Sequence, residues 1–322
     1  MEIGKTLIAI TSCNRLDEVK KYIWDYLDFV NSNVNFHFVL SLDGNNQEYL
    51  DFCDDFNIPL LYSDEREGVG LSKNRILSSF PDYDYYFFIE DDIELLNGAI
   101  FGEIIQLHSI YGFPHFCNHH PEKMTGKIEK MGKEIEFSNT GGAQFAFYSK
   151  LGLSKVGGFH TLFAKYRRFG HTEHTYRFFK AGLQPAPFIF HRNYLKGYFL
   201  IHNPPRVTNI SVKSQEDELI DEERELIDAT SYFFPLQTIS EFSFNNKKMG
   251  WNELVVNFLN TSKRPYPQLS GSKRRLVLAE RNALMAYHKK GLSKLWCLLK
   301  AFILNYKDNS LRHYLKTEWY GK

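Results

Sequence analysis

The fold of this chain is decided by residues 85–92, which read YYFFIEDD. The first five residues are aromatic or apolar, and a short run of this kind is typical of a strand buried within a sheet. Three carboxylates follow at once, at Glu90, Asp91 and Asp92. In open α/β sheets ligands bind at the carboxyl ends of the strands, so this change from apolar to acidic residues indicates a candidate site.

Strands and helices alternate on the amino-terminal side of this run. Residues 7–10 predict a strand, after which apolar residues recur at helical spacing: Leu16, Val19, Ile23, Leu27 and Val30. Further strands are predicted at 36–42 and 60–62, and a further helix at 72–77. The alternation predicts an α/β fold with a mixed, mainly parallel sheet flanked by helices.

The composition is that of an ordinary globular protein. The chain has 322 residues, of which 43% are hydrophobic, and its net charge of +1 gives no field that favours nucleic acid. The four cysteines have no metal-site spacing and are expected to be free thiols. We find no signal-peptide pattern and no run of the ~18–20 apolar residues that a membrane span requires, so we expect a cytoplasmic protein.

The acidic triplet is a candidate metal site. Adjacent carboxylates repel one another unless a cation is shared between them. Hard oxygen ligands suit Mg²⁺ or Mn²⁺, which also bind phosphate oxygens. Because alternate residues of a strand share a face, we expect Glu90 and Asp92 to point together and Asp91 to point away. The alternative is a solvated strand end without a ligand.

Five short motifs, in the same order along the chain, resemble those of the GT-A glycosyltransferases, and in particular the large family 2 of inverting enzymes. The resemblance covers residues 5–205. Three of its motifs depart from the family pattern. The first has one additional residue, the third has shorter spacing and Lys73 in place of an Arg, and the last lacks two acids. The motifs are TSCNR at 11–15, Asp43-Gly44, GLSKN at 70–74, the triplet at 90–92 and GGFHT at 157–161.

This resemblance implies a GT-A (Rossmann-like) catalytic domain over residues 1–210. Apolar residues that recur at helical spacing between residues 277 and 299 predict a mainly helical region at 211–322. It implies that Thr11 and Asp43 contact the nucleotide base, with Asp43 accepting a uracil N–H. Other residues implied in donor binding, near the phosphates or the sugar, are Asn14, Arg15, Lys73, Asn74, Asp91, Gly141 and Gly142.

By the same resemblance, Asp92 together with Glu90 holds Mn²⁺ or Mg²⁺ on the donor diphosphate. A third metal ligand in this family is often a His well past the catalytic helix. His202, which follows an apolar run, is preferred to His191.

The catalytic base is expected in residues 169–177, which read FGHTEHTYR and resemble the start of the helix that carries the base in this family. Aligning Arg177 and Gly182 places His171 where the family has its catalytic Asp, and Glu173 on the second acid. An imidazole titrates near neutrality and a carboxylate can also accept a proton, so both stay candidates, with Glu173 first.

The region after residue 210 carries charge unevenly. Residues 215–228 are acidic, whereas Lys and Arg outnumber acids from Lys273 onward. Residues 289–307 predict a basic amphipathic helix with Trp296 on its apolar face. Such a helix either packs on the domain or on a second copy of the chain, or lies on an anionic membrane surface. The last arrangement would place the enzyme at the inner face of a membrane.

The sequence therefore predicts a metal-dependent inverting glycosyltransferase of the hexosyl class. Its donor is expected to be a nucleotide sugar, with UDP-sugars first. Its acceptor is expected to be a glycan or lipid-linked glycan, as in bacterial polysaccharide or lipopolysaccharide assembly. The alternatives are a sugar nucleotidyltransferase, although the Gly-rich phosphate loop is missing, and a non-catalytic glycan-binding or scaffold protein, which the missing Asp at position 171 favours. No GxGxxG follows the first strand, which argues against a Rossmann dehydrogenase.

Overall fold

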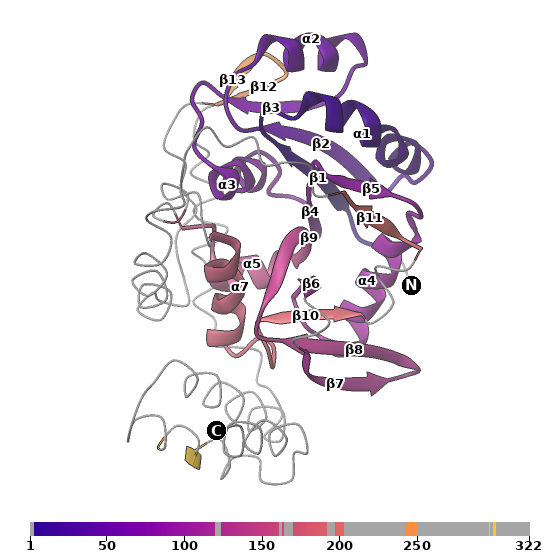
Figure 1. The fold of residues 1–322 in the computed structure, drawn as a ribbon, viewed down its shortest axis with the longest axis vertical. Helices are drawn as coiled ribbons and strands as arrows, with labels where there is room; N and C mark the ends of the chain where they lie inside the picture. The colour runs from indigo at the N-terminus through magenta and orange to yellow at the C-terminus, as the bar shows by residue number, and fades with distance from the viewer. Residues whose placement is uncertain are drawn as a thin grey trace.

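The computed structural model describes residues 3–119, 124–160, 163, 170–191, 197–202, 242–249, 296 and 299–300. Within these residues the main sheet has eight strands in the order β13-β12-β3-β2-β1-β4-β9-β6 (Figure 1). The strands are β1 (Thr6–Ser12), β2 (Phe36–Leu42), β3 (Leu60–Ser63), β4 (Tyr85–Glu90), β6 (His115–His119), β9 (Gly141–Ser149), β12 (Phe242–Phe244) and β13 (Lys247–Met249).

The centre of this sheet is parallel. β1 pairs in parallel with both β2 and β4, and β2 pairs in parallel with β3, so the carboxyl ends of these strands lie along one edge. β9 runs antiparallel between β4 and β6, which brings its amino end, at Gly141, to the same edge. The predicted mixed, mainly parallel sheet is therefore confirmed, and so is the edge at which its polar residues gather.

Helices cover both faces of the sheet (Figure 1). One face carries α1 (Leu16–Asn31), α2 (Gln47–Asp55) and α4 (Ala99–Tyr111), and the other carries α3 (Val69–Ser79), α5 (Lys150–Val156) and α7 (Gly170–Lys180). Strand alternation divides the core accordingly. Ile8 and Ile10 of β1 pack in the first layer, while Leu7 and Ala9 pack in the second.

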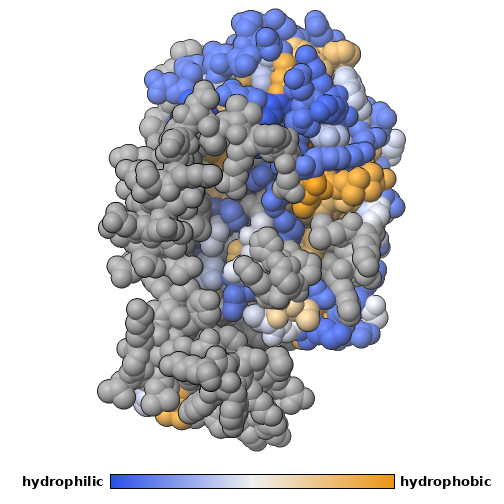
Figure 2. Space-filling model, viewed as in Figure 1, coloured by the Kyte–Doolittle hydropathy of each residue, from blue (hydrophilic) through white to orange (hydrophobic). Residues whose placement is uncertain are grey.

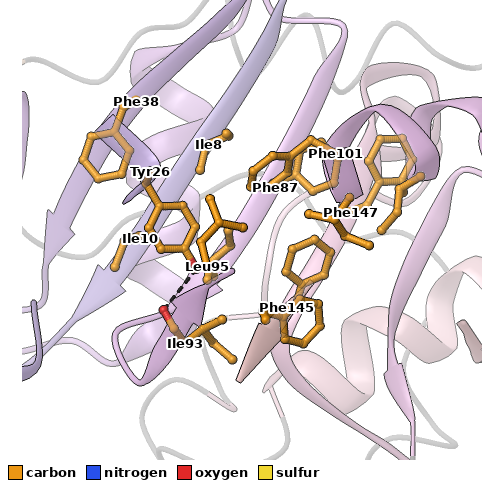
Figure 3. Close-up of a cluster of buried hydrophobic side chains, with 14 of the residues drawn as sticks. Ile8, Ile10, Tyr26, Phe38, Phe87, Ile93, Leu95, Phe101, Phe145 and Phe147 are labelled. Carbon is orange, nitrogen blue, oxygen red and sulfur yellow. Dashed lines mark hydrogen bonds between the residues drawn. The ribbon is translucent and has the colours of Figure 1, made fainter. Parts of the chain in front are cut away.

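The first core layer combines aromatic rings with Ile and Leu side chains (Figure 3). Phe87 of β4 packs edge-on against Phe101 of α4, with 4.8 Å between the ring centroids. The buried Tyr26 hydroxyl donates a 3.1 Å hydrogen bond to the carbonyl of Ile93, so its polar atom is satisfied inside the core. Each fully buried ring of this size contributes about 1.5–3 kcal/mol of hydrophobic stabilisation.

A two-stranded ribbon lies beside the acidic triplet. It pairs β5 (Ile93–Leu95) with β11 (Phe199–Ile201), and Phe199 stacks on Phe145 of the core with 5.0 Å between the centroids. Two apolar side chains at its outer side, Leu200 of β11 and Leu96 just after β5, are about half exposed. Figure 2 shows this surface as an orange patch among blue, polar residues. A second small sheet consists of β7 (Met124–Lys130), β8 (Lys133–Ser138) and β10 (Phe188–His191).

The hairpin β12–β13 extends the main sheet beyond β3, and the sequence does not predict it. Its turn residues Asn245 and Asn246 have φ angles of 44° and 61°, the left-handed conformation that tight hairpins need. The side chain of Asn245 also accepts the backbone N–H of Leu60 at 2.9 Å.

The predicted domain boundary near residue 210 lies outside the described residues, and so does most of the predicted basic helix. There the structure describes only residues 296 and 299–300, where the Lys300 ammonium lies 5.1 Å from the Trp296 ring centroid. None of the helices in the described ranges combines the length and the apolar character needed to cross a bilayer.

Candidate functional site

The acidic triplet sits where β4 ends. The strand stops at Glu90, so Asp91 and Asp92 lie in the turn that follows it. One guanidinium nitrogen of Arg15, Nη1, lies 3.0 Å from Asp91 Oδ1 and 3.4 Å from Asp92 Oδ2. Strand alternation predicts that Asp91 points away from its neighbours, but alternation ends with the strand. Asp91 and Asp92 instead meet at one cation.

A buried chain of hydroxyl groups holds Asp91. Ser12 Oγ lies 2.6 Å from Asp91 Oδ2 and 2.7 Å from the Tyr49 hydroxyl, which accepts the backbone N–H of Arg15 at 2.9 Å. An ionised carboxylate only accepts, so Ser12 donates to Asp91 and Tyr49 donates to Ser12. Burial raises the pKa of Asp91, while Ser12 and Arg15 act against this rise. Ser12 and Tyr49 are not among the site residues that the sequence predicts.

Asp92 and Glu90 are the carboxylates with free acceptor capacity. Asp92 is buried, and its Oδ1 has no hydrogen-bond partner among the described residues. Glu90 likewise meets no hydrogen-bond donor there, and burial raises its pKa although the charge of Lys73 lowers it. A buried acceptor without a donor is costly, and a hard cation would satisfy it. These two side chains therefore fit a divalent metal.

The predicted third ligand, His202, lies beside Asp92 through its backbone only. Its N–H donates to the Asp92 carbonyl at 3.0 Å. Its ring lies 2.7 Å from a Glu94 carboxylate oxygen and stacks on Tyr22, with 4.6 Å between the centroids. Within the described ranges, no three His, Cys, Asp or Glu side chains are arranged to hold a metal ion. The side chain of His191, the other candidate, lies outside the described residues.

Lys73 is a buried cation without a hydrogen-bond acceptor among the described residues. It lies in α3, is 1% exposed, and its ammonium stands 5.5 Å from the Phe159 ring and 5.9 Å from the Phe88 ring. Burial lowers its pKa, and the charge of Glu90 acts against this shift. A charge buried against aromatic faces is stabilised far less than in water, so an incoming anion would be bound strongly there.

His171 faces the same region from the first turn of α7. Burial and the nearby charge of Lys73 lower its pKa to about 4, although the backbone of Gly141 acts against the shift. The ring is thus neutral at pH 7 and has one acceptor nitrogen. A Cβ on Gly141 would collide with the backbone carbonyl of Asn118 and with the Phe188 ring, so this position requires glycine; one on Gly142 would meet only the ends of the Asn118 and Gln144 side chains. The structure therefore brings His171 and the predicted Gly pair together.

Glu173 is occupied inside its own helix. Its carboxylate pairs with Arg177 at 2.9 and 3.0 Å, and both side chains are fully buried. Arg177 also donates to the carbonyls of Val156 at 2.7 Å and Gly158 at 2.6 Å. The Glu173–Arg177 pair therefore holds α7 against residues 156–158, at the end of α5.

Asp43 holds the loop that leads into α3. Its carboxylate accepts the backbone N–H groups of Glu67 at 2.8 Å and of Gly68 at 2.9 Å. Gly68 has a φ of 96°, a conformation that only glycine adopts readily, and it caps α3. The Arg66 Nε lies 3.7 Å from Asp43 Oδ2, so an acceptor and a donor stand side by side.

Three other residues are predicted to bind the sugar-nucleotide donor. Two of them form hydrogen bonds with the protein backbone, and the third turns the chain. The Asn74 amide bonds to both the N–H and the carbonyl of Phe159, at 2.7 and 2.9 Å. Thr11 Oγ1 donates to the carbonyl of Ile89 at 3.4 Å. Asn14 has a φ of 54°, which turns the chain after β1. Their predicted contacts with a donor stay predictions.

Comparison with known proteins finds similarity at the level of structure only. No protein-family profile matches the chain, and no curated protein sequence does. The chain is similar to the mannosyltransferase PcManGT from Pyrobaculum calidifontis in complex with GDP-Man and Mn²⁺ (11% identity, TM-score 0.41, covering 100% of this chain and 89% of that one). It is similar to S. aureus TarS 1–349 (11% identity, TM-score 0.46, covering 99% of this chain and 92% of that one). It is also similar to A197 from STIV (15% identity, TM-score 0.25, covering 47% of this chain and 68% of that one). At these identities and scores, function has to be argued from the side chains of the site.

Proposed function

We propose that this protein is a glycosyltransferase that uses a nucleotide-sugar donor together with Mn²⁺ or Mg²⁺. One observation carries the proposal. At the same edge of the sheet, Asp92 and Glu90 have carboxylate oxygens without donors, and Lys73 has a buried ammonium without an acceptor, among the described residues. A metal ion on a diphosphate complements both, because the cation satisfies the carboxylates and the phosphate oxygens satisfy the ammonium.

In this proposal Asp92 and Glu90 hold the metal. When bound, it would stabilise the negative charge that develops on the departing diphosphate. His202 can join them as a third ligand only if its ring leaves Glu94 and Tyr22.

Asp43 and Arg66 support a donor whose base carries an N–H next to a carbonyl. The carboxylate of Asp43 would accept the N–H, and the neighbouring guanidinium would donate to the carbonyl. Uracil presents this pair at N3 and O4, and guanine presents it at N1 and O6, whereas adenine and cytosine do not. We therefore propose UDP-sugars as donors, with GDP-sugars as the comparison. Thr11 lies near the end of the neighbouring strand β1, and Asn14 lies in the loop that follows it.

His171 is the proposed base. Its acceptor nitrogen takes the proton of the acceptor hydroxyl, the hydroxyl oxygen attacks the anomeric carbon, and the bond to the diphosphate breaks with inversion. A phosphate on Lys73 would offset the positive charge that lowers the pKa of His171, so the base would strengthen once the donor is bound. Glu173 is the first candidate for the base from the sequence, but its carboxylate forms a buried ion pair with Arg177.

The remaining parts of the proposal rest on the sequence. We propose a hexosyl donor and a glycan or lipid-linked glycan acceptor. We also propose that the basic helix at residues 289–307 either lies on the inner face of a membrane or packs on the protein, including on a second copy.

The test is release of the nucleotide diphosphate from UDP-sugars and GDP-sugars, with and without Mn²⁺, by the full chain and by Asp92→Asn. We expect metal-dependent release with one nucleotide class, lost in the variant while its unfolding temperature is unchanged. If no sugar nucleotide is cleaved and none raises the unfolding temperature, the glycosyltransferase proposal is wrong and the non-catalytic scaffold replaces it.

A further inference from the structure

Arg15 is the cation that the structure places on the acidic triplet. Its Nη1 bridges Asp91 Oδ1 at 3.0 Å and Asp92 Oδ2 at 3.4 Å, and its side chain is 20% exposed. The guanidinium is therefore stabilised by the carboxylates to which a divalent cation would bind.

The two carboxylates that Arg15 bridges are not equivalent. Both oxygens of Asp91 have donors, one from Ser12 and one from Arg15. Asp92 receives only the longer contact on Oδ2, and its Oδ1 has no partner among the described residues. Asp91 is thus the anchor of Arg15, while Asp92 has an oxygen left for a second cation.

The anchor is rigid, because the backbone and the side chain of Arg15 belong to one network. The Arg15 N–H donates to Tyr49, whose hydroxyl bonds to Ser12, and Ser12 donates to the same Asp91 that holds the guanidinium. These groups come from the β1 loop, α2 and the turn after β4. Arg15 is therefore a fixed positive charge at this site and does not move freely like a surface side chain.

We propose that Arg15 and the divalent cation compete for Asp92, and that the diphosphate of the donor relieves this competition. The inference rests on the proposed function. A metal on Asp92 would share one carboxylate with the guanidinium, and like charges a few ångströms apart repel in a poorly solvated site. A diphosphate offers oxygens that match the guanidinium fork, so Arg15 exchanges a contact with Asp92 for one with phosphate. Metal and nucleotide then strengthen each other's binding by the same factor.

The first arm of the test uses Mn²⁺ alone. Free Mn²⁺ is titrated by electron paramagnetic resonance against the full chain, Arg15→Gln and Lys127→Gln. Lys127 is the matched control, because its loss changes the charge equally but it pairs with Glu134, 2.7 Å away, and not with the triplet. We expect Arg15→Gln to bind Mn²⁺ about tenfold more tightly than the wild type and Lys127→Gln to stay within about twofold. Equal or weaker binding by a folded Arg15→Gln overturns the inference.

The second arm needs no variant. The Mn²⁺ affinity of the wild-type chain is measured with and without UDP, and with and without GDP. We expect one nucleotide to raise it by about tenfold or more, and a nucleotide that binds without changing it overturns the inference. If neither Arg15→Gln nor the wild type binds Mn²⁺ with any nucleotide, the metal assignment of the proposed function fails instead. Mn²⁺ binding without nucleotide binding refutes only the nucleotide-sugar donor, and the first arm then decides on Arg15.

Discussion

Two clusters of buried charge in this protein differ in how they are balanced. In α7, Glu173 and Arg177 form an ion pair in which both side chains are fully buried. At the end of β4, Asp91 and Asp92 share one guanidinium, that of Arg15, and the ammonium of Lys73 stands nearby against aromatic rings. The first cluster neutralises itself. The second has carboxylate oxygens and an ammonium that no described protein group satisfies.

The difference distinguishes buried charges that stabilise the fold from buried charges that we assign to ligand binding. A buried charge that is matched within the protein stabilises a particular packing, here of α7 against residues 156–158. A buried charge that is left unmatched costs stability, and it persists where a ligand supplies the missing partner. We therefore propose that Glu173 stabilises the packing of α7 and that Asp92 binds a ligand, although both are acids in motifs that resemble one family.

Breaking the matched pair is expected to have the largest effect on stability. Arg177→Met leaves Glu173 buried without its partner and leaves two carbonyls without a donor, so the free energy of unfolding should fall by about 3–5 kcal/mol. Urea denaturation measures this change. Arg15→Gln, where the site is partly open, should cost less than about 1 kcal/mol, and equal losses in the two variants would erase the distinction.

Changing the unmatched carboxylate should affect activity and not stability. Asp92→Asn keeps the shape of the side chain but removes the charge that we assign to the metal. We expect nucleotide release to fall by about 100-fold or more, with the free energy of unfolding unchanged within about 0.5 kcal/mol. Wild-type turnover in this variant would remove Asp92 from the site.

The neutral histidines beside Lys73 predict a pH dependence of stability. Burial, with smaller contributions from Lys73 and His171, lowers the pKa of His115 to about 3. In the unfolded chain it is near 6.5, so its contribution is complete above pH 6.5 and is lost as the pH falls towards 3. This loss amounts to about 2 kcal/mol between pH 6.5 and 5. The free energy of unfolding of His115→Gln, measured over this range, should fall less steeply than that of the wild type; equal slopes would contradict the burial of a neutral ring.

The smallest effect concerns the hydroxyl chain that holds Asp91. Tyr49→Phe removes one hydroxyl from that chain, whereas the control Tyr86→Phe removes a buried hydroxyl bonded to Phe80 at the opposite edge of the sheet. Both should lower the free energy of unfolding by about 1 kcal/mol. Only Tyr49→Phe should weaken nucleotide binding, and isothermal titration with UDP or GDP distinguishes them. Equal nucleotide affinities would show that Tyr49 is purely structural.

The sequence predicts the sheet and the site edge because both follow from local patterns. Apolar runs ending in polar residues locate β1, β2 and β4, and parallel pairing then brings Asp43 and the triplet to one edge. Contacts between distant segments have no such local pattern. Ser12 and Asp91 are 79 residues apart, and the hairpin at 242–249 pairs with β3, far earlier in the chain. The four-residue spacing of Glu173 and Arg177 could have suggested their pairing, but not its burial.

The sequence also does not predict that Lys73 is buried. A lysine in a short helix normally reaches solvent, but α3 is buried along most of its length between the sheet and its neighbours. The burial of Lys73 results from tertiary packing, which the hydrophobic periodicity of the sequence does not predict.

Lys73→Met tests the central claim most directly, because its two expected effects have opposite signs. The measurement is the unfolding temperature of the full chain and of this variant, alone and with Mn²⁺ plus UDP or GDP. If Lys73 is an anion site, the apolar substitution stabilises the protein without ligand, by removing a buried charge, and abolishes the rise caused by nucleotide. A variant that is destabilised without ligand, yet still stabilised by nucleotide as the wild type is, would contradict the account.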